Sequence, residues 1–474
     1  QRIALQAHAA HPLPGGALAA RLQAALPFAL TKAQRRVFDE IRVDMARPVP
    51  MLRLVQGDVG SGKTVVAALA AMLAVEDGRQ VALMAPTELL AEQHLANLRV
   101  WLQPLGVRVS WLAGKVTGRA RVAALAEVAG GEAQVVVGTH ALMQEAVAFH
   151  DLALAIVDEQ HRFGVHQRLA LRDKGTGGHG SDARRVPHQL VMTATPIPRT
   201  LTMAAYADLD VSAIDELPPG RTPVQTVVLS AARRPELVER IRAACAEGRQ
   251  AYWVCTLIDE EIEKPGHGWL GTGARTRMPV VAQSAQATFE ALCNALPEAR
   301  VGFVHGRMKA GDKQAAMRAF KAGEIDLLVA TTVIEVGVDV ANASLMIVEN
   351  AERLGLAQLH QLRGRVGRGS AASSCVLLYQ PPLPALARQR LETLRQSNDG
   401  FLIAEKDLEL RGPGELLGTR QTGLPAFRLA DLARDADLLP AVHRIGEQLL
   451  REAPEIADQL VARWVGGAAR YASA

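Results

Sequence analysis

The segment GDVGSGKT, Gly57–Thr64, has the residue types and spacing that point most directly to chemistry. It fits the pattern G-x-x-x-x-G-K-[ST] at every fixed position and lies between an apolar run and a helical pattern. Backbone amides of such a loop hold a β-phosphate, Lys63 can reach the β- and γ-phosphates, and the Thr64 hydroxyl can bind Mg²⁺. The predicted nucleotide-binding residues of this loop are Gly57, Gly60, Ser61, Gly62, Lys63 and Thr64.

Two adjacent carboxylates end the apolar run LALAIVDEQH, residues 152–161. Asp158 can hold the magnesium ion, and Glu159 can orient or deprotonate the attacking water. A solvent-exposed strand end is the simpler alternative, but the complete phosphate loop upstream favours the catalytic interpretation. His161 could instead be a metal ligand, yet no H-E-x-x-H or similar cluster accompanies it, so we expect it to contact the next motif.

Two further segments carry polar residues at positions that suit the same site. MTATP, residues 192–196, places Thr193 and Thr195 at the sheet edge where Asp158 is expected. Before the phosphate loop, the spacing of Thr31 and Gln34 leaves two readings open, a helix capping box or a contact of Gln34 with the nucleotide base.

The segment QLRGRVGRG, residues 361–369, holds three arginines separated by glycines: Arg363, Arg365 and Arg368. A basic turn that faces solvent or nucleic acid is one interpretation. An arginine that stabilises transition-state charge is the other, and it would greatly accelerate an ATPase built on a phosphate loop. If that arginine comes from a second lobe, hydrolysis requires the two lobes to close.

Short apolar runs alternate with helical patterns from residue 31 onward, which predicts parallel sheets wrapped in helices. Three prolines and a glycine in Asp215–Val224 interrupt the alternation, and we expect a hinge there. The predicted strands are 51–55, 81–85, 135–138, 152–157 and 188–192 in a first lobe, and 224–229, 251–255, 300–306, 326–331 and 344–350 in a second. The predicted domains are a helical linker from an upstream domain at 1–27, a nucleotide-binding lobe at 28–215, a second lobe at 216–380 and a mainly helical segment at 381–474.

Composition sets outer limits on these interpretations. A length of 474 residues with 49% hydrophobic content allows several cores, and 53 basic against 49 acidic residues gives mild support for a polyanionic partner. The four cysteines form no C-x-x-C pair and suit buried thiols in a reducing cytosol. No run of eighteen apolar residues and no secretion leader are present, so we expect a cytoplasmic protein without a membrane partner.

Together with VATTVIEVGVDV (329–340) and GFVHGRM (302–308), these motifs resemble the superfamily 2 helicases and translocases over residues 28 to about 370. The resemblance implies two RecA-like lobes that use ATP and Mg²⁺. It assigns adenine recognition to Gln34, adds Phe28 and Asp339 to the nucleotide site, and makes Arg365 and Arg368 arginine fingers. It also implies a set of residues that couple ATP hydrolysis to movement along DNA: Gln160, His161, Thr193, Thr195 and Gln361.

Within that superfamily, QGDVGSGKT, DEQHRFGV, QLHQLRGRVGRG and residues 400–432 resemble the RecG family of branch-migration helicases, and less closely the transcription-repair coupling translocases. An RNA helicase is a further alternative. The RecG resemblance implies remodelling of stalled forks and Holliday junctions by a duplex DNA translocase whose wedge domain lies upstream. It further implies a nucleoid-associated monomer that contacts single-stranded DNA-binding protein. DNA is expected across loops 85–90, 138–142 and 304–308, mainly through phosphates, because aromatic residues make up only 4% of the chain.

The glycine-rich stretch 410–425 resembles a dinucleotide fingerprint, but no apolar strand precedes it. We therefore interpret it as a loop along the motor that transmits lobe closure to DNA. The residues expected to act in translocation are Arg411, Arg420 and Gln421.

Overall fold

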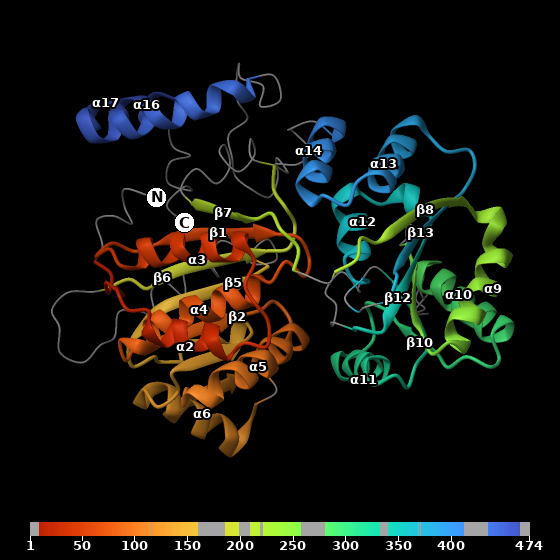
Figure 1. Cartoon of the computed structure of the whole chain (residues 1–474), viewed down its shortest axis with the longest axis horizontal. Coiled ribbons are helices and arrows are strands. Elements are labelled where there is room, and N and C mark those ends of the chain that lie inside the picture. The colour runs from red at the N-terminus through yellow and green to blue at the C-terminus, as the bar shows by residue number, and fades with distance from the viewer. Residues whose placement is uncertain are drawn as a thin grey trace, which may run out of the picture. The chain divides into compact units, whose positions relative to one another are not determined.

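The structure is a computed structural model that describes residues 9–114, 116–159, 185–198, 209–218, 221–256, 280–331, 340–367, 369, 371–411 and 435–464 (Figure 1). Contacts divide the chain into two units, one formed by Gln1–Pro219 with Gly400–Ala474 and the other by Gly220–Asp399. The change at residue 219 falls inside the predicted hinge. Each unit holds one parallel sheet, so the predicted fold of two tandem RecA-like lobes with a helical C-terminal part is confirmed.

The first lobe is built on a seven-stranded parallel sheet in the order β3-β4-β2-β5-β6-β1-β7. Its strands are β1 (Leu52–Gly57), β2 (Gln80–Met84), β3 (Val109–Leu112), β4 (Val135–Gly138), β5 (Leu152–Asp158), β6 (His188–Thr193) and β7 (Asp210–Ile214). The five strands predicted for this lobe are all present. The two edge strands, β3 and β7, were not predicted, because they are short and less apolar than the buried strands.

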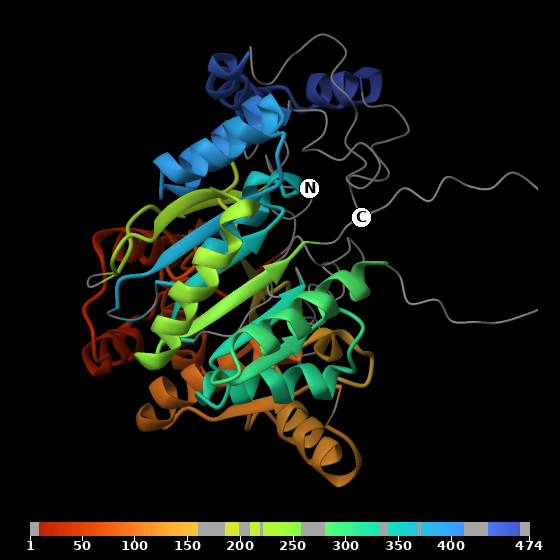
Figure 2. The ribbon, with the colours of Figure 1, turned by 90° about the vertical axis from the view of Figure 1, so that its right-hand side faces the viewer.

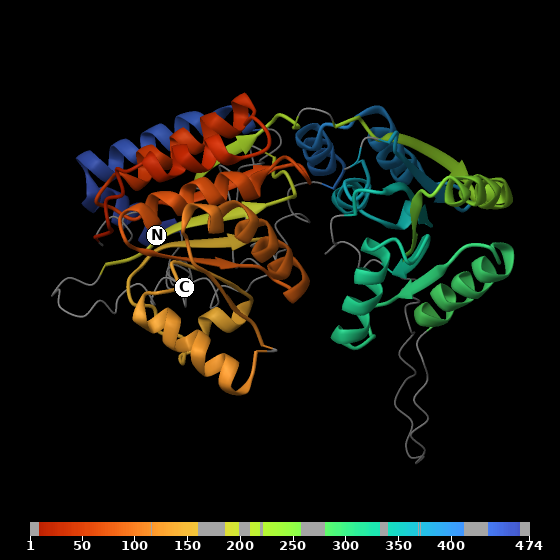
Figure 3. The same cartoon turned by 60° about the horizontal axis from the view of Figure 1, so that its bottom comes forward.

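The helices of the first lobe are α2 (Ala17–Ala25), α3 (Lys32–Met45), α4 (Lys63–Glu76), α5 (Glu88–Leu102) and α6 (Gly118–Gly130). Between its first two residues and Glu76 at its end, helix α4 is apolar on all sides, as expected of a helix that is covered all round. It packs against β1, β2 and β5, and α2 and α3 cover it from outside (Figure 3). The phosphate loop therefore opens into a helix that the core holds fixed.

The first described residues belong to this core. Residues 1–27 were expected to form a helical linker without a core of their own, but Leu13, Ala19 and Leu22 lie in one cluster with the apolar side chains of α4. The Glu76 carboxylate, at the end of α4, accepts hydrogen bonds from the backbone N–H groups of Ala17 and Leu18 in the first turn of α2. The apolar side chains of this segment are thus buried against the first lobe.

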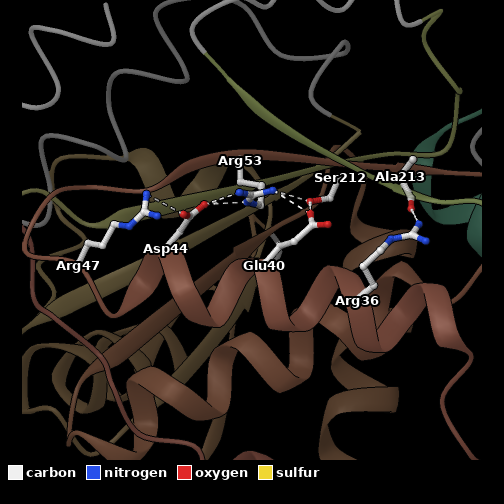
Figure 4. A network of polar contacts seen from close by, with 7 residues as sticks. All are labelled: Arg36, Glu40, Asp44, Arg47, Arg53, Ser212 and Ala213. Atoms are coloured by element: carbon white, nitrogen blue, oxygen red, sulfur yellow. Dashed lines mark hydrogen bonds and ion pairs between the residues drawn. The ribbon is translucent and has the colours of Figure 1, made fainter. Parts of the chain in front are cut away.

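Arg53, the second residue of β1, joins β1, α3 and β7 of the first lobe (Figure 4). Its guanidinium is buried and donates to Asp44 and Glu40 of α3, with N–O distances of 2.5 to 3.1 Å, and to Ser212 Oγ of β7 at 2.6 Å. Arg47 binds the second oxygen of Asp44 at 3.1 Å. This ionic cluster holds the edge strand β7 in place. Each buried charge in it has a partner, so the cluster does not carry the energetic penalty of an unpaired buried charge.

The second lobe has a six-stranded parallel sheet in the order β10-β11-β9-β12-β13-β8. Its strands are β8 (Gln225–Ser230), β9 (Gln250–Cys255), β10 (Val301–Val304), β11 (Leu327–Thr331), β12 (Ala343–Glu349) and β13 (Ser374–Tyr379). Helices α9 (Arg234–Ala246) and α10 (Val280–Ala295) lie along this sheet (Figure 2), followed by α11 (Ala310–Lys321), α12 (Leu356–Arg363) and α13 (Ala385–Gln396). The five predicted strands of this lobe are present, and β13 is an addition.

The C-terminal part is helical where the structure describes it, as predicted. It contains α14 (Gly400–Arg411), α16 (Leu439–Glu452) and α17 (Pro454–Trp464), and the last two pack against each other. Among the described residues, no helix is both long enough and apolar enough to cross a bilayer.

All four cysteines are free thiols. Cys255 and Cys375 are buried as expected, whereas Cys245 and Cys293 are only partly buried. Burial raises the pKa of Cys255 and of Cys375 to about 12, and that of Cys245 to about 11. These three side chains are therefore uncharged thiols at neutral pH, which suits a structural role.

Two buried histidines join the first described residues to the sheet. His188 Nδ1 accepts from Met51 N–H at 3.0 Å and its Nε2–H donates to the carbonyl of His11 at 2.7 Å. His11 Nδ1 accepts from Arg185 at 2.7 Å, which leaves its Nε2–H to donate to Asp151 at 3.1 Å. Both rings are satisfied as neutral imidazoles, and a second proton on either would face a donor.

These contacts predict that the first lobe loses stability in mild acid. Burial, followed by the charges of Arg79 and Arg185, lowers the pKa of His11 from 6.5 to about 4, and burial lowers that of His188 as well. The unfolded chain therefore binds more protons than the folded chain between pH 6.5 and about 4, so this contribution is complete above pH 6.5 and is lost as the pH falls. Urea unfolding at pH 7, 6 and 5 should show a falling midpoint.

The variant His188→Asn cannot titrate at this position and should show a shallower pH dependence between pH 7 and 5. The matched variant of an exposed histidine, His150→Asn, should keep the wild-type slope. Equal slopes for the wild type and His188→Asn would contradict the assignment.

Candidate functional site

The register of three neighbouring strands brings the predicted catalytic segments together. Asp158 at the end of β5 pairs with Met192 of β6, and Thr193 of β6 pairs with Gln56, the residue before the phosphate loop. Because parallel strands end at one edge of a sheet, the carboxylate pair, MTATP and the phosphate loop share that edge. The structure thus assembles these predicted motifs within one lobe.

The phosphate loop has the shape of an anion cradle. Gly60 and Gly62 have φ values of +80° and +86°, a region that favours glycine, and Gly62 is the residue before the first turn of α4. The Ser61 hydroxyl is buried and has no hydrogen-bond partner among the described residues. A buried polar group without a partner carries an energetic cost that a bound phosphate oxygen would remove, so the loop fits a nucleotide.

Lys63 begins α4 and lies inside the loop. Its ammonium group donates to the carbonyls of Gly57 at 2.6 Å and Asp58 at 2.9 Å. With 9% of its surface exposed, this cation is held where phosphates are predicted to bind. Thr64 follows it in the first turn of the same helix, as the magnesium prediction requires.

Gln34 connects the phosphate loop to α3. The capping box, one of the two readings that the spacing left open, is present, because Thr31 Oγ1 accepts from Gln34 N–H at 3.1 Å and Gln34 Oε1 accepts from Thr31 N–H at 2.9 Å. The Gln34 amide also donates to the carbonyl of Ser61 at 2.8 Å. Its predicted contact with adenine stays a prediction, as does that of Phe28, whose half-exposed ring lies 6.4 Å from the ring of Trp101.

This geometry predicts that Gly62→Ala disables the loop. The new Cβ would collide with the Gln34 amide nitrogen, and the left-handed backbone would be strained as well. We expect at least a tenfold loss of ADP affinity in fluorescence titration, which corresponds to about 1.4 kcal/mol.

Gly78→Ala is the matched control for Gly62→Ala. Gly78 follows the same helix, has a φ of +72° and has open space around its Cβ position. It should lower stability through strain alone and leave ADP affinity unchanged. If both variants bind ADP equally well, the close approach to Gln34 does not shape the site.

Asp158 is a buried carboxylate with partners on both oxygens. His94 Nε2 lies 2.7 Å from Oδ2, and the backbone N–H of Glu159 donates to Oδ1 at 3.1 Å. Burial by itself would raise the pKa of Asp158, but the hydrogen bond and charge of His94, the charge of Lys63 and the Glu159 N–H together lower it. Asp158 is therefore an anion at neutral pH, as a magnesium ligand must be.

Glu159 turns the chain sharply at the end of β5. Its φ of +53° lies in the left-handed region, which is uncommon for a residue with a side chain and costs about 1 kcal/mol or more. Its N–H also donates to the carbonyl of Met192 at 2.9 Å, and its carboxylate accepts a long 3.5 Å bond from Ala194 N–H in MTATP. This turn directs Glu159 toward the MTATP segment.

Thr193 and Thr195 bind each other, with 2.9 Å between the two hydroxyl oxygens. Ile197 N–H donates to Gln56 Oε1 at 3.0 Å, which fixes the end of this segment against β1. Gln160 and His161 lie outside the described residues, so their predicted coupling role stays a prediction.

His94 was not predicted to belong to the site. It lies on α5, in a segment where nothing in its own spacing indicates catalysis. The order of strands provides the missing information, since β2 leads into α5 and pairs directly with β5. A side chain early in α5 can therefore reach the end of β5.

The second lobe holds the predicted arginines and Gln361 in and just after α12. Gln361 and Arg365 are buried, at 7% exposure each, whereas Arg368 and Asp339 lie outside the described residues. Arg363 has a structural part, because it donates to the carbonyls of Leu394 and Ser397 at 2.7 Å and so binds the end of α13. The assignment of Arg365 and Arg368 as fingers stays a prediction.

The residues predicted to act in translocation are described least. Arg411 is the last residue of α14, so its predicted role stays a prediction. Arg420 and Gln421 lie outside the described residues.

Among the described residues, no cluster of three or more His, Cys, Asp or Glu side chains could hold a metal by itself. That is compatible with Mg²⁺, which protein sites hold with few side chains, phosphates and water.

Three family models match the chain in series. They are the DEAD/DEAH box helicase at residues 31–204, the helicase conserved C-terminal domain at residues 269–370, and the ATP-dependent DNA helicase RecG, domain 3, C-terminal, at residues 397–462. The last match covers α14, α16 and most of α17.

Curated relatives carry the same description. The ATP-dependent DNA helicase RecG of Escherichia coli O157:H7 is 60% identical over 477 residues, which cover 100% of this chain and 66% of the relative. RecG of Synechocystis sp. is 48% identical, with 94% of this chain and 50% of the relative covered. This chain therefore spans about two thirds or less of the length of these relatives.

Solved structures agree with the sequence comparison. A structure of RecG bound to a three-way DNA junction has a TM-score of 0.74 and 40% identity, and the match covers 92% of this chain and 54% of that one. The S. cerevisiae protein Dbp5, bound to RNA and ADP BeF3, has a TM-score of 0.54 at 14% identity, covering 84% of this chain and 92% of that one. The second likeness shows a shared fold only.

Proposed function

Because this chain belongs to the RecG family of ATP-dependent DNA helicases, we propose that it is the ATP-driven motor part of such an enzyme. The observation that carries the proposal is the edge of the first lobe, where the phosphate loop after β1 and the Asp158–Glu159 pair at the end of β5 lie on either side of β6. A domain that binds the nucleotide without hydrolysing it would need the loop and a metal ligand such as Asp158, but not Glu159.

The proposed nucleotide is ATP with Mg²⁺. The amides around Gly60 and Gly62 and the Lys63 ammonium would hold the phosphates, and Thr64 and Asp158 would hold the metal. Bound MgATP supplies the phosphoanhydride bond whose hydrolysis drives movement. Glu159 is placed to orient the attacking water, and its turned backbone links it to Ala194 of MTATP.

The proposed role of Arg365 and Arg368 is to stabilise charge that develops on the phosphates. If this is correct, Arg368→Ala should bind ADP like the wild type but turn over ATP about a thousandfold more slowly. Steady-state ATPase and ADP titration on the same sample check this pair of outcomes. Unchanged turnover would favour a slowly hydrolysing, nucleotide-switched binding protein.

The proposed substrate is duplex or branched DNA, including stalled forks and Holliday junctions, whose branches the motor would migrate during recombination and repair. Contacts mainly to phosphates would make binding independent of sequence and sensitive to salt. The relative that supports this choice is RecG bound to a three-way DNA junction. We place the activity with the chromosome in the bacterial cytoplasm and infer a monomer, with single-stranded DNA-binding protein as a further partner.

Strand separation at a junction is a separate proposal, because a third to a half of each relative lies outside the match. The motor would supply ATP hydrolysis and movement along duplex DNA. A wedge domain in the remaining part would supply the splitting of the arms. A transcription-repair coupling type of translocase would share the motor but not residues 397–462 in this form.

ATPase stimulation tests the substrate class. Turnover is measured with duplex DNA, forked DNA and single-stranded or duplex RNA at equal nucleotide concentration. We expect stimulation by both DNA forms and little by RNA, and none for Lys63→Ala, which loses the cation of the phosphate loop. Lys321→Ala, an exposed lysine of α11, is the control that should behave like the wild type. A preference for RNA would overturn the proposed function.

A further inference from the structure

We propose that His94 is a positioning residue that holds Asp158 in its metal-binding orientation and links the metal site to helix α5. The inference rests on the proposed function, because it assigns a regulator to the same ATP site. It concerns contacts within the first lobe alone.

The contact between His94 and Asp158 is short and buried. The distance of 2.7 Å between His94 Nε2 and Asp158 Oδ2 is that of a charge-assisted hydrogen bond, and the two residues are 7% and 9% exposed. Glu159 N–H binds the other oxygen at 3.1 Å. An ionised carboxylate has about four acceptor positions, so these two donors fix its orientation and still leave room for a metal.

Helix α5 connects this contact to the residues predicted to bind DNA. The helix begins at Glu88, directly after Thr87, whose hydroxyl accepts from Leu90 N–H at its first turn. Residues 85–90, predicted to contact DNA, therefore lead into the helix that carries His94 and form its first turn. Seven residues separate Thr87 from His94, which is about 10 Å along a helix.

A rigid helix of this length transmits a small shift without deforming. When DNA engages residues 85–90, a displacement along α5 would alter the distance between His94 and Asp158. Donors that orient a metal ligand matter energetically, since their loss costs about tenfold to a hundredfold in metal affinity. DNA contact and magnesium binding would in this way be coupled through one hydrogen bond.

A purely structural role is the competing explanation, in which His94 only fastens α5 to β5. The two explanations differ in what the loss of the hydrogen bond does to magnesium. A structural fastening changes stability alone, whereas a positioning residue changes the gain in nucleotide affinity that Mg²⁺ provides.

The test compares side chains that do and do not reach Asp158. His94→Gln places an amide N–H close to the position of Nε2, whereas His94→Asn is one methylene shorter and falls short of the carboxylate. Leu98→Ala, one turn further along α5 and buried, is the control for destabilisation. Each variant is titrated with fluorescent ADP in Mg²⁺ and in EDTA, and its melting temperature is measured.

We expect Mg²⁺ to tighten ADP binding in the wild type, in His94→Gln and in Leu98→Ala. In His94→Asn this tightening should fall about tenfold while the affinity in EDTA stays unchanged. The ratio of DNA-stimulated to DNA-free ATPase should fall in the same variant. Leu98→Ala should melt at a lower temperature without either change.

Two failures can be told apart. If His94→Asn keeps the full Mg²⁺-dependent tightening, His94 is structural and this inference is wrong, although the proposed function stands. If the wild type shows no Mg²⁺-dependent ADP binding and no ATPase, the proposed function itself fails.

Discussion

The parallel register of β2, β5, β6 and β1 is the constraint on which the candidate site depends. Each strand delivers one component at its carboxyl end: β1 the phosphate loop, β5 Asp158, β6 Thr193, and β2 the connection into α5. A slip of one residue would turn every inward side chain of a strand to the opposite face of the sheet. The apolar side chains that fill both faces therefore secure the catalytic geometry as well as the stability.

Buried polar contacts then fix the phosphate loop and Asp158 in the places to which the strands bring them. Gln34 joins the start of α3 to the phosphate loop, and His94 joins α5 to Asp158. In each case one amide or imidazole binds a buried acceptor oxygen, and hydrogen bonds to buried polar groups matter most in a low-dielectric interior. The fold and the site thus share contacts, and a change at either residue reaches both.

The sequence alone was sufficient to predict the features that depend on residues close together in the chain. The phosphate loop, the capping box of Thr31 and Gln34, and the buried strands are each defined by a short run of residues. The contacts of His94 and Arg53 could not be predicted, because the partner of His94, Asp158, lies 64 residues away. The partners of Arg53 lie on two separate elements, α3 and β7. The packing of α2 was missed for the same reason, and the edge strand β7 was missed because it is short and less apolar than the buried strands. The burial of α2 depends on surfaces that only the assembled lobe provides.

The ionic cluster around Arg53 has a consequence for experiments in which ionic strength is varied. Mobile ions weaken attraction between exposed charges, with a screening length of about 10 Å at 0.1 M salt, but they act far less on pairs removed from solvent. The Arg53 guanidinium and Asp44 are both largely enclosed, at 10% exposure of their side chains. The first lobe should therefore keep β7 attached at salt concentrations that displace DNA phosphates. A salt titration can then release nucleic acid from a lobe that remains folded.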